Sequence, residues 1–164
     1  MSEFPDYRIG PEAFKYFKMA YEFQMQGEFE KAIFYYKKSL EIEPTAEAYT
    51  FLGWTYSFMG RLEEAIEQCQ KAIAIDPEFG NPYNDIGAYL LQMGKFDEAI
   101  PWLEKAKKAK RYENPEFPYC NLGRIYELKG LWPLAVEEYK KALEIRPDYE
   151  PALIALRRLS ALLN

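Results

Sequence analysis

The sequence has no histidine among its 164 residues, which removes the commonest general base and the commonest zinc ligand of proteins. It also has no glycine-rich loop of the kind that cradles phosphates, and no paired carboxylates outside ordinary helix surfaces. These absences exclude the usual catalytic arrangements. We therefore expect a protein that is not an enzyme and that needs no metal ion and no cofactor.

Long apolar runs and a basic excess are also absent. No stretch approaches the roughly 18 apolar residues that span a bilayer, and residues 1–10 lack the apolar core of a signal peptide. The net charge of −5 argues against nucleic acid and against an anionic membrane surface as partners. The one basic run, residues 105–111, is interpreted as a solvated helix end, with a patch for an acidic partner as the alternative. The sequence accordingly predicts a soluble cytoplasmic protein.

The chain does contain one pattern that recurs four times. Turn glycines lie at positions 27, 60, 94 and 130, so the spacings are 33, 34 and 36 residues. A glycine can end a helix in the left-handed conformation at little cost, and small residues let helix backbones approach closely. Such small residues recur seven positions before each turn glycine and five positions after it: Ala20, Gly53, Gly87 and Gly123, and then Ala32, Ala65, Ala99 and Ala135.

With these registers the chain resembles the tetratricopeptide repeat (TPR) family over roughly residues 11 to 149. The resemblance implies an all-α fold, a right-handed α-solenoid of antiparallel helix pairs. We place the pairs at about 11–26 and 28–42, 46–59 and 62–75, 81–93 and 96–110, and 115–129 and 132–146. The single domain then divides into a lead segment (1–10), four repeats (11–44, 45–79, 80–115 and 116–149) and a capping helix (150–164).

Two features depart from regular stacking. The third junction has Arg111 where the other repeats have a helix-closing proline, and it carries two extra residues, so we expect a longer loop around residues 110–115. Cys69 and Cys120 lie nearly two repeats apart, too far for a disulfide. Reduced thiols are the simplest interpretation, and a redox role for Cys120 is the alternative.

The resemblance also indicates where a ligand binds, because the first helix of each TPR pair faces the concave side of the solenoid. We expect a peptide-binding groove that is aromatic in its first half and polar in its second. An alternative is that several of the rings pack against neighbouring first helices and never meet a ligand. The predicted groove residues are Phe14, Phe17, Tyr21, Phe51, Trp54 and Phe58, followed by Asn84, Asp85, Asn121 and Arg124.

Two binding modes known in the family do not match. The clamp that holds a C-terminal carboxylate needs cations, but the corresponding positions carry residues such as Tyr21 and Asp85. An asparagine ladder would need asparagine at one position of every repeat, and here only Asn121 provides it. The leading hypothesis is an adaptor that binds a peptide or helical segment of another protein. The alternative is a self-associating scaffold or assembly factor for a secretion- or pilus-type complex.

The C-terminal stretch has the periodicity of a helix that closes the array. Leu153, Leu156, Leu159 and Leu163 are expected to cover the fourth repeat. Ile154 and Leu162 fall on another side, so the predicted state is a monomer, with a weak homodimer through this helix as the alternative.

Overall fold

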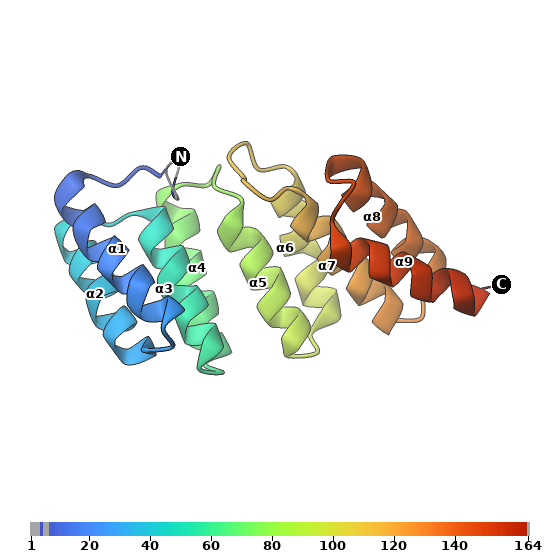
Figure 1. The fold of residues 1–164 in the computed structure, drawn as a ribbon, viewed down its shortest axis with the longest axis horizontal. Helices are drawn as coiled ribbons and strands as arrows, with labels where there is room; N and C mark the ends of the chain where they lie inside the picture. The colour runs from blue at the N-terminus through green and yellow to red at the C-terminus, as the bar shows by residue number, and fades with distance from the viewer. Residues whose placement is uncertain (1–3, 5–6, 164) are drawn as a thin grey trace.

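The computed structural model describes residue 4 and residues 7–163, and this part of the chain forms nine helices joined by short connections (Figure 1). An all-α helical repeat solenoid is confirmed. The helices are α1 (Pro11–Met25), α2 (Phe29–Ile42), α3 (Ala46–Phe58), α4 (Leu62–Ile75), α5 (Asn81–Gln92), α6 (Phe96–Lys107), α7 (Glu116–Leu128), α8 (Trp132–Ile145) and α9 (Glu150–Leu163).

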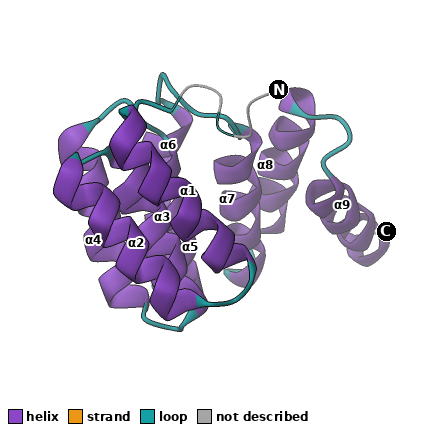
Figure 2. Ribbon diagram, turned by 60° about the vertical axis from the view of Figure 1, so that its left-hand side comes forward, coloured by secondary structure: helices purple, strands orange, loops and turns teal. Residues whose placement is uncertain are grey.

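Two layers arise from the way in which the helices stack. Each odd-numbered helix packs on the even-numbered helix that follows it, and each even-numbered helix packs on the first helix of the next pair. The first helices α1, α3, α5 and α7 also contact one another in order, so they form a continuous inner layer. Figure 2 shows this arrangement from the side, with α9 beside α8 at one end.

The turn glycines and the small residues behave as the sequence predicts. All four turn glycines have a positive φ, between 73° and 77°, a conformation that residues other than glycine rarely adopt. They are Gly27, Gly60, Gly94 and Gly130. At Gly87 an added Cβ would lie 2.4 Å from the side chain of Leu103, so only glycine permits α5 and α6 to come this close. Glycine therefore has two roles in the helix pairs: it allows the turns between the two helices, and at Gly87 it allows the two helices to pack closely.

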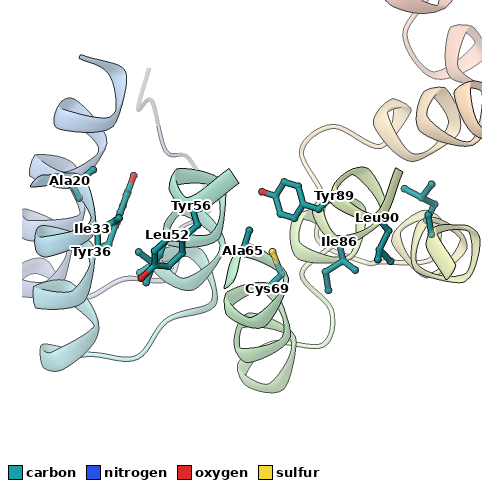
Figure 3. Packing of buried hydrophobic residues seen from close by; sticks show 14 of the residues in the cluster. Ala20, Ile33, Tyr36, Leu52, Tyr56, Ala65, Cys69, Ile86, Tyr89 and Leu90 are labelled. Carbon is teal, nitrogen blue, oxygen red and sulfur yellow. The ribbon is translucent and has the colours of Figure 1, made fainter. Parts of the chain in front are cut away.

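The core lies between the two layers. Leu52 and Leu122 are buried inside their helix pairs, and Cys69 of α4 is fully buried against α3. Figure 3 shows Leu52, Cys69 and Ile86 as part of one run of apolar contacts that passes from repeat to repeat. Stability therefore depends on interfaces between neighbouring repeats as well as on each pair.

The third junction has the longer loop that the sequence predicts, but the loop begins earlier than expected. Helix α6 ends at Lys107, short of the expected boundary near 110, because the chain turns back to lie beside the second junction. The backbone N–H of Arg111 donates to the carbonyl of Glu78 at 3.0 Å, and the N–H of Gly80 donates to the carbonyl of Arg111 at 2.8 Å. These bonds hold residues 108–111 out of the helix. Figure 1 shows the loop between α6 and α7 rising above the helices.

Helix α9 packs on α8 through small residues and through part of the predicted leucine stripe. Ala152, Ala155 and Leu159 are buried there, and Leu156 is partly buried. The expectation for Leu163 was wrong, since half of its side chain is exposed. Ile154 and Leu162 are exposed, as expected. Within the described residues, no helix is both long enough and apolar enough to cross a membrane.

Candidate functional site: a cavity on the inner helix layer

The lead segment places two aromatic side chains on the first helices. The ring centroid of Phe4 lies 4.9 Å from that of Tyr21 and 5.3 Å from that of Phe17, both edge to face. The ring centroid of Tyr7 lies 5.7 Å from that of Phe17 and 5.9 Å from that of Phe51. Edge-to-face pairs at such distances are favourable. We use the term aromatic cluster for Phe4, Tyr7, Phe14, Phe17, Tyr21 and Phe51.

Two carboxylates hold the backbone of the lead segment. The N–H of Arg8 donates to Oε2 of Glu47 at 2.9 Å, and the N–H of Gly10 donates to Oε2 of Glu43 at 2.7 Å. Glu47, at the start of α3, is buried, and its other oxygen accepts from the Arg111 guanidinium at 2.8 Å. Arg111 also pairs with Asp76 at 2.7 Å. The lead segment and the third junction are therefore held by the same buried carboxylate.

A cavity of about 350 Å³ opens on the inner layer beside the aromatic cluster. Its walls come from the lead segment, from first helices α1, α3, α5 and α7, and from the loop that precedes α7. We call it the groove cavity. It is lined by Phe4, Tyr7, Tyr21, Thr50, Phe51, Trp54, Asn81, Asp85, Glu113, Asn114 and Phe117.

The groove cavity is acidic and aromatic. Asp85 and Glu113 contribute carboxyl groups, and none of the described residues that line the cavity is basic. Burial raises the pKa of Asp85 to about 7, although a hydrogen bond with the side chain of Asn84 lowers it in part. A cation in the cavity would favour the ionised form of Asp85, and the faces of neighbouring rings also attract cations.

The predicted groove residues do not form one surface. Tyr21, Phe51, Trp54 and Asp85 come together and line the groove cavity. Trp54 is half-buried, with its ring centroid 5.7 Å from that of Phe51 and 5.2 Å from that of Phe58. Phe58 is half exposed and stacks on a ring from α2 rather than lining the cavity.

Other predicted residues serve the packing of the solenoid. Phe17 has no exposed surface, because the rings of Phe4 and Tyr7 lie on it. Phe14 is partly buried beside Phe4. Asn84 is also buried, and its Oδ1 accepts from Nδ2 of Asn121 at 2.9 Å. These residues follow the alternative in which groove side chains pack against neighbouring first helices.

Arg124 is exposed on α7, outside the groove cavity. Its neighbour on the same helix, Glu127, accepts from the hydroxyl of Tyr139 at 2.7 Å and pairs with Arg158 of α9. Some polar side chains of the predicted polar half of the groove thus already have hydrogen-bond or ion-pair partners within the protein.

Seven lining residues were missing from the predicted groove: Thr50, Asn81 and Phe117 lie on first helices, and the other four come from segments outside the repeat register. Phe4 and Tyr7 lie in the lead segment, and Glu113 and Asn114 lie in the irregular third junction. The signal for the lead segment was available, because two aromatic residues stand there in an otherwise polar stretch. Nothing in the repeat pattern places the third junction against α3.

Two observations concern metal ligands and thiols. Among the described residues, no three histidine, cysteine, aspartate or glutamate side chains gather in a way that could hold a metal ion. Both cysteines are free. Burial raises the pKa of Cys120 to about 11 and raises that of Cys69 as well, so both thiols are largely protonated at neutral pH and poorly nucleophilic.

Family comparisons agree with the repeat boundaries seen in the structure. Models described as tetratricopeptide repeat match residues 13–45, 46–79 and 79–148. The mitochondrial import receptor subunit TOM70 of Saccharomyces cerevisiae is 40% identical over 77 residues, which are 47% of this chain. Those residues span 12% of TOM70, so the likeness covers a small part of that receptor.

Solved structures show the same fold. PilW, described as a widely conserved type IV pilus biogenesis factor, has a TM-score of 0.83 and 21% identity, covering 93% of this chain and 70% of PilW. YrrB, described as a TPR protein with an unusual peptide-binding site, has a TM-score of 0.71 and 20% identity, covering 88% of this chain and 74% of YrrB.

Proposed function

Because the chain belongs to the tetratricopeptide repeat family, whose fold indicates protein–protein interaction, we propose that it is a non-enzymatic module that binds a segment of another protein at the groove cavity. The observation that carries the proposal is the position of Trp54, half-buried at the wall of a cavity formed by four first helices. Pre-formed pockets of a few hundred Å³ lined by rings and a few polar groups are typical of ligand sites.

The chemistry of the groove cavity selects among segments. Asp85 and Glu113 disfavour an acidic side chain or a terminal carboxylate. A lysine or arginine side chain suits the same walls, since its aliphatic stem can lie on Trp54 while its charge meets the carboxyl groups. YrrB, a TPR protein with an unusual peptide-binding site, shares only its fold with this chain, so the choice of a basic segment rests on the residues of this chain.

The test is capture of partners from a lysate with the wild-type protein and with Trp54→Ala, followed by titration calorimetry on the captured protein. Truncating an aromatic hot spot costs about 2 kcal/mol or more, so binding should weaken by roughly thirty-fold or more. Trp132→Ala is the matched control, because that tryptophan is 42% exposed at the start of α8 and away from the cavity. Equal affinities for wild type and Trp54→Ala would contradict the proposal.

A scaffold role is the second candidate, and α9 favours it. Ile154, Leu162 and Leu163 are each at least half exposed on this helix, and exposed apolar patches often mark contacts between proteins. The fold is also that of PilW, a pilus biogenesis factor. Light scattering separates the candidates, since a scaffold would self-associate with rising concentration and an adaptor would not. A cytoplasmic location belongs to the proposal for the adaptor and rests on the sequence patterns alone.

A further inference from the structure

We propose that Phe4 and residues 7–10 of the lead segment act as a built-in ligand of the inner helix layer, and that the partner segment which replaces them carries two aromatic residues three positions apart. This inference rests on the proposed function and adds to it: the two aromatic residues of the partner segment take the places of Phe4 and Tyr7 in the wall of the groove cavity, beside the basic side chain that meets Trp54 and the carboxyl groups. It adds that the site is partly occupied before any partner arrives.

The side chains of the lead segment make contacts of the kind expected for a bound peptide. Phe4 packs edge to face on three rings of α1 and on one ring of α3, at centroid distances from 4.9 to 6.4 Å. Tyr7 packs on Phe17 and Phe51, and burial raises its pKa well above the usual range. Phe4 and Tyr7, three positions apart, thus make six ring contacts with residues of the first two repeats.

The main chain of the lead segment is held in the same manner. Glu47 and Glu43 accept the backbone N–H groups of Arg8 and Gly10, which any residue except proline could donate. The side chain of Arg8 is 72% exposed and makes one long ion pair, at 3.8 Å. Binding therefore depends on the positions of the two rings and on backbone N–H donors, and not on the side chain of Arg8. A segment from another protein can supply the same rings and donors.

Replacement requires the ring contacts of Phe4 and Tyr7 and the backbone hydrogen bonds of Arg8 and Gly10 to be exchanged for those of a partner. Residues 7–10 precede α1 directly, and Figure 1 shows them running from the start of α1 above the helices. A tethered segment competes at an effective concentration on the order of millimolar. A partner that uses the same contacts binds only those molecules in which the site is open. Its apparent affinity is therefore reduced in proportion to the fraction of such molecules.

The experiment uses the full chain and a peptide of residues 2–10, blocked at both ends. The protein is compared as wild type and as the double variant Phe4→Ala, Tyr7→Ala, by calorimetry and by the NMR signal of the Trp54 indole. A peptide with both aromatic residues replaced by alanine is the control. We expect the peptide to bind the double variant at least ten-fold more tightly than wild type, and the control peptide not to bind.

Two results would overturn the inference: equal affinity of the peptide for both proteins, or no binding to the double variant at millimolar peptide. If the double variant does not fold, the single variant Phe4→Ala is tested in the same way, since Tyr7 then still covers Phe17. Capture with Trp54→Ala keeps the two proposals apart. If Trp54→Ala still loses its partner while the peptide fails to bind, the groove binds proteins but the lead segment is not its model ligand.

Discussion

Replacing Asp85 by asparagine should make this protein more stable at neutral and alkaline pH. Burial raises the pKa of Asp85 to about 7 in the folded protein, compared with about 3.9 in an unfolded chain. The folded state therefore holds the proton more tightly between these two values. Stability is lost as the pH rises through this window, because ionisation is easier in the unfolded chain, and the loss is complete above about pH 7.

The size of the effect follows from the two pKa values. A difference of about three pH units corresponds to about 4 kcal/mol of free energy of unfolding. Asp85 is partly open to the groove cavity, so water offsets some of this cost, and we expect about 2–4 kcal/mol for Asp85→Asn at pH 8. At about pH 4 both proteins are neutral at this position, and the difference should be close to zero.

Urea unfolding followed by circular dichroism measures this difference at several pH values between about 4 and 8. Asp148→Asn is the control, because that side chain is 82% exposed and its replacement should change stability by less than about 0.5 kcal/mol at any pH. A difference between wild type and Asp85→Asn that does not grow with pH would refute the reasoning. Since asparagine cannot become negative, the stabilised variant should also bind a basic segment less tightly, a trade of function against stability.

Three further predictions concern packing and charge. Leu122→Ala should cost about 2–5 kcal/mol, because Leu122 is fully buried and leaves a cavity; a shift of the thermal midpoint under a degree or two would contradict its place in the core. Truncation after Asp148 removes α9, uncovers Ala135 and Tyr139 on α8, and should cause aggregation in light scattering; a soluble monomer of unchanged stability would contradict the capping role. A weak dimer through Ile154 and Leu162 would be abolished by charging both, which sedimentation at rising concentration would show.

Features with a repeating period could be predicted from the sequence. The four turn glycines, the small residues such as Gly87, and the buried position of Leu122 each recur at a fixed spacing, and each spacing reflects one requirement of helix packing. The helix boundaries follow from the same signals to within a few residues, except at the third junction. Local rules are sufficient there because every repeat contacts mainly its neighbours.

The candidate site was less predictable because part of its wall comes from two segments without a period, the lead segment and the third junction. The pattern correctly placed Trp54 and Asp85 on the inner layer, but it could not show that Phe17 is covered from above. That covering depends on Phe4, which lies outside every repeat and contacts helices that follow it in the chain. Contacts of this kind depend on tertiary structure, so neither helical periodicity nor composition encodes them.

The two irregular segments of the chain are coupled through Glu47. Its two oxygens accept from the Arg8 backbone and from the Arg111 side chain, so one buried carboxylate fixes the lead segment and the third junction together. The junction also contributes Glu113 to the groove cavity, while the lead segment contributes Phe4. Removal of Glu47 would leave the Arg111 guanidinium with Asp76 as a remaining partner and the Arg8 N–H without this acceptor. We therefore expect Glu47→Ala to loosen both walls of the cavity at once, which hydrogen exchange of residues 7–10 and 108–115 would reveal as a joint loss of protection. Loss of protection in one segment alone would show that the carboxylate does not couple them.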